Sequence, residues 1–365
     1  MKKFLKIAGV LFLGAIGIGL IWYFQSLKID GEPLLTACWG VEVYDDLTGE
    51  KVVGVEDLDF DPATGTIFMS AYDRRAVARE IEAGKVTTQG GIYTINISDI
   101  TEEGILKVTD ISREFKEAGN EFRPHGFVFV PETYPEIIAI NRLYSYSDSK
   151  LSVAPAFLGF ELLDGNWVHT RQVILEGVCD PYDVLKTGAM LIPMMMFTDV
   201  TGKCEGGNYS QGVVKIYAGK KPDIVINDLS FPNGIVATRK FFAVAQTRDD
   251  SILIFESEDT EESKKIKLPI APDNLTVDQD DNLYVAGFPN LIDYYFYMKS
   301  WMGVNKSPSA AYRISPETYE QTLLFKDNGS MISGATVALR AGDYLILGSG
   351  WDDNIAICSG MDGLD

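Results

Sequence analysis

A short sequence unit recurs six times along the chain and constrains its fold more than any other feature. In the first copy, residues 54–73, Glu56 and Asp57 precede an alternating apolar run, a Pro-Ala-Thr-Gly turn and a second apolar run. Polar residues ahead of a strand that turns back on itself predict a β-hairpin. The strands that open the six copies are expected to begin near Leu58, Phe127, Val184, Ile235, Leu275 and Val337.

The spacing of these copies predicts the architecture. Consecutive copies start 40 to 69 residues apart. A four-stranded propeller blade takes roughly 40 to 50 residues, so the longer intervals leave room for loops. No Pro/Ser-rich linker or charge run divides the chain after its first segment. We therefore predict an all-β fold, a six-bladed β-propeller that forms one domain over residues 28–365.

The first 27 residues are of a different kind. Lys2, Lys3 and Lys6 precede an uninterrupted apolar run from Ile7 to Phe24, and no small-x-small cleavage site follows. This pattern predicts a helix over residues 1–27 that is a signal anchor or an uncleaved leader, with a cleaved leader as the alternative. With any of these three kinds of segment, the rest of the chain lies outside the cytosol, either secreted or anchored to a membrane. A retained leader would contact a membrane or another lipid surface.

Charge and cysteine content restrict the partners and the compartment. A net charge of −20 excludes nucleic acid as a partner. Cys38 and Cys358 lie in the first and last strand-like segments, where a disulfide would fasten the two ends of the ring. Such a bond would contribute roughly 5 kcal/mol by the chain-entropy estimate. The alternative is two separate buried thiols. Cys179 and Cys204 could pair or remain free.

Five asparagines stand in glycosylation sequons. Asn96, Asn208, Asn305 and Asn328 predict a glycoprotein if the source cell glycosylates. Asn274 is expected to remain bare, because the propeller prediction places it inside the molecule.

Polar residues just before the six predicted strands suggest a metal site. The innermost strands of a propeller line its axis, so these residues should gather at one mouth of the channel. Carboxylates and amides without thiolates are the hard oxygen donors that calcium takes, about six to eight of them. The alternative is that Asp, Asn and Gly only form turns, but their recurrence at the same point favours a metal. The residues are Glu56, Asp57, His125, Tyr182, Asp183, Asn233, Asp273 and Asn274.

The motifs around these residues resemble those of the paraoxonases, which are secreted, calcium-dependent lactonases and arylesterases. The matching stretches are GVEDLDF, FRPHGF, FPNGI, APDNLTVD and GATVALRAGDYLILGS, in that order. The resemblance extends from about Cys38 to Cys358.

The resemblance implies two calcium ions, one catalytic and one structural. It also implies that His125 helps to activate water. The catalytic ion would be held by Glu56, Asn233, Asp273 and Asn274, and the structural ion by Asp57, Asp183 and the backbone carbonyl of Phe127.

Two positions depart from the family pattern. Tyr182 stands where the family has a calcium-binding asparagine, so the site loses a donor or recruits Asp180 or water. Arg142 stands where the family has a second histidine. A cationic Arg142 near His125 would lower the pKa of the imidazole and could not accept its proton.

The sequence thus predicts a calcium-dependent hydrolase of small lipophilic esters or lactones. His125 or Glu56 would take the proton from the attacking water. An aromatic stretch, residues 291–302, is expected to be helical, either as the wall of an apolar pocket or lipid-facing surface or as a helix packed on the propeller. Two alternatives are a sugar lactonase of the gluconolactonase type and a non-enzymatic propeller that calcium stabilises and that binds a partner or lipid.

Overall fold

The structure is a computed structural model that describes residues 29–147, 150–187, 194–204, 210–238, 240–256 and 262–364. The predicted leader, residues 1–27, lies outside these ranges. Within them, no helix is both long enough and apolar enough to cross a membrane.

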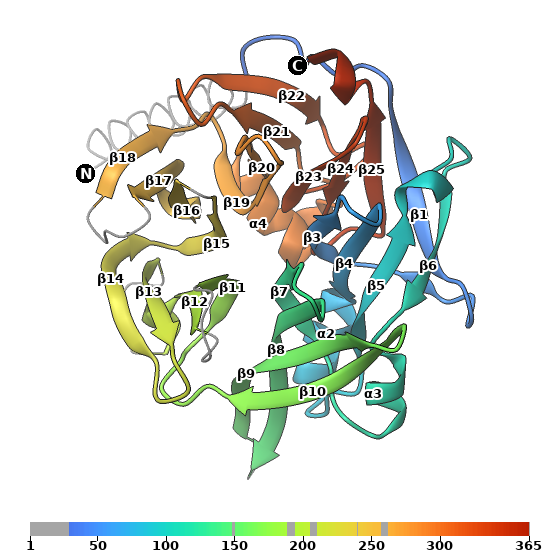
Figure 1. Cartoon of the computed structure of the whole chain (residues 1–365), viewed down its shortest axis with the longest axis vertical. Coiled ribbons are helices and arrows are strands. Elements are labelled where there is room, and N and C mark those ends of the chain that lie inside the picture. The colour runs from blue at the N-terminus through green and yellow to red at the C-terminus, as the bar shows by residue number, and fades with distance from the viewer. Residues whose placement is uncertain are drawn as a thin grey trace, which may run out of the picture.

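Four of the sheets have four antiparallel strands each and lie around a common centre (Figure 1). Each begins with one of the predicted strands, so the repeated unit of the sequence is also the unit of the fold. The sheets are β7 (Pro124–Val130), β8 (Glu136–Ser147), β9 (Lys150–Leu163) and β10 (Asn166–Ile174); β11 (Pro181–Thr187), β12 (Met194–Asp199), β13 (Gln211–Tyr217) and β14 (Asp223–Ser230); β15 (Pro232–Ala237), β16 (Phe241–Gln246), β17 (Ser251–Glu256) and β18 (Glu262–Lys267); and β19 (Ala271–Val277), β20 (Leu283–Phe288), β21 (Ser309–Ile314) and β22 (Gln321–Asp327).

The remaining strands form one nine-stranded sheet that contains both the first and the last strand of the described chain. One part is β3 to β6 in sequence order, and the other is β23, β24, β25 and the N-terminal strand β1. Parallel pairing of β1 with β6 joins the two parts, and β2 pairs with β1. The strands are β1 (Cys38–Asp45), β2 (Lys51–Val52), β3 (Val55–Asp61), β4 (Thr66–Tyr72), β5 (Gly90–Asn96), β6 (Ile105–Asp110), β23 (Val337–Ala341), β24 (Tyr344–Gly348) and β25 (Asn354–Ser359).

The first and last strands of the ring pair with each other, and a disulfide covers the junction. Cys38 of β1 lies directly opposite Cys358 of β25 in the antiparallel register, and the two form a disulfide. The predicted closure of the ring is therefore confirmed. Cys179 and Cys204, whose pairing the sequence left open, form the second disulfide.

Six strands form a closed cycle around the axis. β3, β7, β11, β15, β19 and β23 each contact the next strand in this order, and β23 contacts β3. Hydrophobic clusters fill the space between adjacent sheets. For example, Ile138 and Phe157 pack against Val184 and Phe197 of the following sheet. The repeated four-stranded sheets of an all-β, propeller-like fold are thus confirmed.

Five of these inner strands share one irregularity at the same place. The pairing register of each shifts by a β-bulge near the strand's first residues. A bulge inserts an extra residue and turns its side chain away from the regular alternation. The shifts lie at Val55/Asp57, Pro124/Phe127, Pro181/Val184, Pro232/Ile235 and Pro272/Leu275, so the predicted site residues lie in or beside them.

Two helices lie at one mouth of the axis. The helix α2 (Arg74–Glu82) begins after Asp73, whose carboxylate accepts a hydrogen bond from the Ala76 N–H. The helix α4 (Leu291–Lys299) is capped in the same way by Asn290 and confirms the helix expected in the aromatic stretch. The short helices are α3 (Arg113–Glu117), η1 (Ile97–Asp99), η2 (Thr201–Lys203), η3 (Thr247–Asp249), η4 (Trp301–Gly303) and η5 (Met361–Leu364).

Candidate metal centre and cavity

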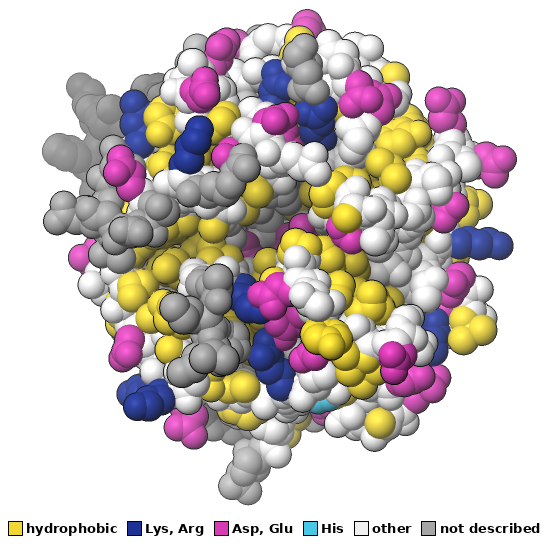
Figure 2. All heavy atoms as spheres, viewed as in Figure 1, with side chains coloured by type: hydrophobic (Ala, Val, Ile, Leu, Met, Phe, Trp, Pro, Cys, Tyr) yellow, Lys and Arg dark blue, Asp and Glu magenta, His cyan; other side chains and the backbone are white. Residues whose placement is uncertain are grey.

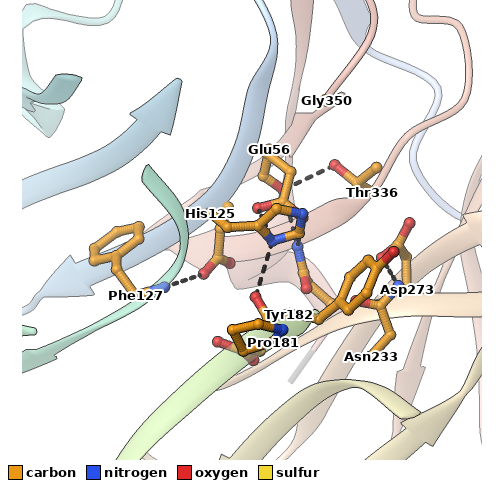
Figure 3. A network of polar contacts seen from close by, with 12 residues as sticks. Glu56, His125, Phe127, Pro181, Tyr182, Asn233, Asp273, Thr336 and Gly350 are labelled. Carbon is orange, nitrogen blue, oxygen red and sulfur yellow. Dashed lines mark hydrogen bonds and ion pairs between the residues drawn. The ribbon is translucent and has the colours of Figure 1, made fainter. Parts of the chain in front are cut away.

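Buried polar side chains from separate sheets meet at one end of the axis (Figure 3). Glu56, His125, Asn233 and Asp273 come from β3, β7, β15 and β19 and are each at most 5% exposed. Asn274, the residue after Asp273, is fully buried. The structure therefore brings together these residues, which are far apart in the sequence, as predicted.

Asn274 and Thr336 fix the position of Glu56. The side-chain amide of Asn274 donates to the carbonyl oxygen of Glu56 at 2.9 Å and to its Oε1 at 3.1 Å. The Thr336 hydroxyl donates to the same carbonyl at 2.8 Å. These contacts leave the second carboxylate oxygen of Glu56 facing the cluster.

Three oxygen atoms of the cluster are buried and have no hydrogen-bond donor. They are Oε2 of Glu56, Oδ1 of Asn233 and Oδ1 of Asn274. A buried acceptor without a partner is unfavourable by about 1 to 3 kcal/mol, and three together complement a cation. The residues therefore fit the calcium ion that the sequence predicts. Among the residues in the described ranges no three His, Cys, Asp or Glu side chains form a metal-binding group; the candidate set combines carboxylates with asparagine amides.

The electrostatics of the carboxylates agree with this fit. Burial raises the pKa of Glu56, although Arg74 and the amide of Asn274 oppose the shift. Burial and the negative charge of Glu56 raise the pKa of Asp273 well above its ordinary value. A divalent cation between the two carboxylates would offset the cost of burying their charges and the repulsion of Asp273 by Glu56.

Asp57 and Asp183 lie deeper and connect neighbouring inner strands. Asp57 accepts hydrogen bonds from the backbone N–H of Leu58 and, at 3.0 Å, from that of Phe127. Asp183 accepts one from the N–H of Ile235 at 2.8 Å. Burial and mutual repulsion raise the pKa of Asp57 well above its ordinary value. The pair predicted for a second ion is thus close enough to interact.

His125 faces the cluster through one ring nitrogen. Its Nδ1 lies 2.9 Å from the carbonyl oxygen of Tyr182 and 3.4 Å from Oε2 of Glu56. Because a carbonyl only accepts, Nδ1 carries the proton and Nε2 has the free electron pair. Burial, together with the positive charges of Arg142 and Arg74, holds the pKa of His125 well below its ordinary value. The expected effect of Arg142 on this imidazole is therefore present.

The two departures from the family pattern form one charged cluster. Arg142 donates to Asp180 Oδ1 at 2.8 Å. Lys203 donates to Asp180 Oδ2 and to the hydroxyl of Tyr182. Both oxygens of Asp180 thus bind cations, and the Tyr182 hydroxyl faces Lys203. Burial and Asp180 raise the pKa of Tyr182, which stays a neutral phenol.

A cavity of about 1020 Å³ opens onto this cluster. Glu56, His125, Tyr182, Asn233 and Asp273 line it and form what we call its floor. Its walls are apolar side chains of α2 and aromatic and aliphatic side chains of α4, with Lys299 at the end of α4. They are Val77, Ala78, Ile81, Leu291, Ile292, Tyr294, Tyr295, Phe296, Met298 and Lys299. The predicted role of the aromatic stretch as a pocket wall is confirmed.

Sequence reasoning did not single out three cations of this cavity, Arg74, Lys203 and Arg248. They lie on α2, η2 and η3, which follow the second strands of their sheets. The buried guanidinium of Arg74 donates to the carbonyls of Gly54 and Gly350 and lies 3.8 Å from Glu56. Its position directly after the helix-capping Asp73 was the one available signal.

Comparison with known proteins agrees with the motif resemblance. Residues 207–357 match the family model described as Arylesterase, and this range includes Asn233, Asp273 and Asn274. No characterised protein sequence matches the chain significantly. Among solved structures, a candidate gluconolactonase has a TM-score of 0.48 at 12% identity, covering 93% of this chain and 95% of that one. A chain of a nidogen/laminin complex has a TM-score of 0.49 at 11% identity, covering 82% and 95%.

Proposed function

We propose that this protein is a calcium-dependent hydrolase of lipophilic esters or lactones, built on a six-bladed propeller. The observation that carries the proposal is the set of three donorless, buried oxygens on Glu56, Asn233 and Asn274. Glu56 and Asn233 line a large cavity, and Asn274 lies directly behind Glu56 through its hydrogen bonds. The match of residues 207–357 to the arylesterase model supports the type of reaction. The blade count follows if the nine-stranded sheet is divided between β1 and β6.

Two ions are proposed. Glu56, Asn233, Asp273 and Asn274 would hold the ion at the cavity floor. Asp57, Asp183 and the carbonyl of Phe127 would hold the deeper one. We leave the Tyr182 hydroxyl out of the donor set, because a neutral phenol beside the ammonium of Lys203 is a poor partner for a second cation.

Calcium, when bound, polarises a carbonyl oxygen and stabilises the negative charge that develops on it. The residues of the chain supply the rest. His125 holds its proton on Nδ1 through the Tyr182 carbonyl, so Nε2 can accept a proton from water in the cavity. The resulting imidazolium would lie 3.4 Å from the Glu56 carboxylate, which stabilises it. The aromatic side chains of α4 exclude water from the apolar part of the substrate.

The cavity mouth also supports a lipid surface as a partner. Ile292 and Tyr295 of α4 line the cavity and are 55% and 41% exposed. Trp301 and Met302 of η4, which follows α4 in the chain, are 50% and 89% exposed. Exposed aromatic and apolar side chains of this kind suit the interface of a lipid layer. Two disulfides support an oxidising, non-cytosolic location.

Hydrolysis of aryl acetates and long-chain lactones, with and without a calcium chelator, tests the proposal. Chelation should abolish turnover, and readdition of calcium should restore it. The variant Glu56→Gln keeps the size of the side chain but removes its charge, and it should reduce turnover far more than yield. Glu114→Gln, at an exposed position, is the matched control. Unchanged turnover in Glu56→Gln would refute the assignment.

The departures at Tyr182 and Arg142 favour one alternative, a non-enzymatic propeller. In that case chelation should lower only thermal stability, with no ester or lactone hydrolysed at any calcium concentration. A strong preference for gluconolactone would indicate a sugar lactonase instead.

A further inference from the structure

The charge of the cavity is opposite to that of the whole chain. The protein has a net charge of −20, and acidic side chains lie around the face shown in Figure 2. The acidic residues that line the cavity are Glu56 and Asp273, both assigned above to the metal. The basic residues that line it are Arg74, Arg142, Lys203, Arg248 and Lys299.

These cations have few acidic partners. Asp180 is one carboxylate shared by Arg142 and Lys203. Arg74 is 3.8 Å from Glu56, whose charge a bound calcium ion would offset. The inference therefore rests on the proposed function at this step, since a loaded metal site leaves the cavity with an excess of positive charge.

Phe231 forms a surface between two of the cations. The Nζ of Lys203 lies 5.3 Å from the centroid of its ring, and the guanidinium of Arg248 lies 6.0 Å from it. Phe231 has a φ of +56°, in the left-handed region that bulky residues rarely adopt. Such strain often marks a functional position. The Phe231 ring, with the two cations beside it, thus lies two residues before Asn233 of the metal cluster in the chain.

Unsatisfied donors point to an acceptor in the same cavity. Nη2 of Arg74 and Nε of Arg142 are buried and have no hydrogen-bond partner. Arg74 is only 7% exposed. A buried donor without an acceptor is unfavourable, so these two cations add to the positive charge of the cavity and favour an anionic ligand over a neutral one.

We propose that the cavity selects ligands and substrates that carry an anionic oxygen group, a carboxylate or a phosphate, on an apolar body. The anionic group lies among Lys203, Arg248 and the Phe231 ring. The apolar body lies along the aromatic side chains of α4, so the reacting carbonyl reaches the metal cluster. Lys299, exposed on the last turn of α4, attracts the anion to the mouth of the cavity.

Calorimetric titration of the calcium-loaded full chain with decanoate, decyl phosphate and decanol tests the proposal without any need for turnover. An anionic ligand should bind about tenfold more tightly than decanol, and added salt should weaken the preference. Tighter binding of decanoate, or of decyl phosphate, supports the proposal and identifies the anionic group. Equal affinity for decanol and both anions would overturn it.

Two variants locate the subsite. Lys203→Gln should weaken decanoate binding about tenfold, because Lys203 is partly buried, and Arg248→Gln about threefold, because Arg248 is exposed. Lys107→Gln, an exposed position on β6, is the control and should bind as the wild type does. Among the described residues, the exposed side chain of Arg248 forms no ion pair and no buried contact, so the Arg248→Gln variant should fold. An anion preference that persists in both variants would place the anion elsewhere and refute the subsite.

A hydrolysis assay separates this inference from the proposed function. The ratio of kcat/KM for nitrophenyl adipate, which has a free carboxylate, to that for neutral nitrophenyl hexanoate should fall in Arg248→Gln. A chain that hydrolyses neither ester but binds decanoate through Lys203 would refute the hydrolase and support the anion subsite. An active chain with equal ratios in wild type and Arg248→Gln would refute only the subsite.

Discussion

The side-chain amide of Asn274 donates hydrogen bonds to both the carbonyl oxygen and the Oε1 of Glu56, at 2.9 and 3.1 Å. The Oδ1 of Asn274 is buried in the cluster and has no hydrogen-bond donor. Asn274 thus both positions Glu56 and offers a ligand oxygen. Its sequon is inaccessible because the side chain is fully buried, as expected.

The first prediction concerns this pair and the metal. Calcium at about 100 times its Kd should raise the free energy of unfolding of the wild type by about 2.7 kcal/mol. Asn274→Ala removes one ligand and the positioning of another, so the calcium-dependent rise in Tm should largely disappear. Asn305→Ala, at an exposed sequon, should keep the full rise. Equal rises in Asn274→Ala and wild type would contradict the metal assignment.

The inner strands could be predicted from sequence because the signal is local. Each opens with a polar pair, continues as an apolar run and is followed by a turn, and these features are sufficient to place β3, β7, β11, β15, β19 and β23. The convergence of Glu56, Asn233 and Asp273 then followed from propeller geometry alone.

The β-bulges at the site were not predicted, because a bulge is a property of the pairing between two strands. Pro124, Pro181, Pro232 and Pro272 precede four of the five shifts. Proline cannot donate to a ladder and is tolerated at strand starts and bulges, so its recurrence was a usable signal. The parallel pairing of β1 with β6 was also unexpected, because the sequence holds no local trace of which edges meet.

The cations of the cavity were missed for a related reason. Lys203 and Arg248 stand on short turns after β12 and β16, outside the repeated motif. The packing of the β11–β14 sheet against the β15–β18 sheet brings them together around Phe231, which lies between β14 and β15. When the partners of a residue come from another sheet, the sequence on either side of that residue contains no pattern that predicts the contact.

The two disulfides should differ in their effect on stability. Replacing Cys38 and Cys358 by serine opens a loop of 320 residues, and replacing Cys179 and Cys204 opens one of 25. The chain-entropy model predicts losses of roughly 5 and about 3 kcal/mol, respectively. Urea unfolding of the two double variants at equal protein concentration compares them. A larger loss for the Cys179/Cys204 variant would show that the ring junction is held mainly by β1–β25 pairing.

Arg75 is predicted to hold the cavity wall in place. Its guanidinium donates to the carbonyls of Tyr297 and Trp351 and to the hydroxyl of Ser300, and it packs on the Tyr297 and Trp351 rings. Arg75→Ala should therefore loosen the C-terminal end of α4.

The expected loss of stability is roughly 1 to 2 kcal/mol. If the protein hydrolyses esters, KM should rise more than kcat falls, because the wall contacts the substrate body and not the reacting carbonyl. Arg79→Ala, on the exposed side of the same helix, is the matched control. A selective fall in kcat, with KM unchanged, would contradict this role.

The last prediction concerns the loop after α2. Partial burial would raise the pKa of Glu80, but hydrogen bonds from the backbone and hydroxyl groups of Thr88 and Thr87 lower it to about 2. Because the pKa of Glu80 is lower in the folded state, its hydrogen bonds stabilise the fold at pH values above the ordinary pKa of a glutamate. This stabilisation is pH-dependent. It is lost as the pH falls from about 4.5 towards 2. Glu80→Gln should remove this part of the pH dependence and speed amide exchange at Thr87 and Thr88, whereas Glu82→Gln, exposed on the same helix, should do neither. Exchange at both threonines that is as slow in Glu80→Gln as in the wild type would show that the carboxylate does not hold the loop.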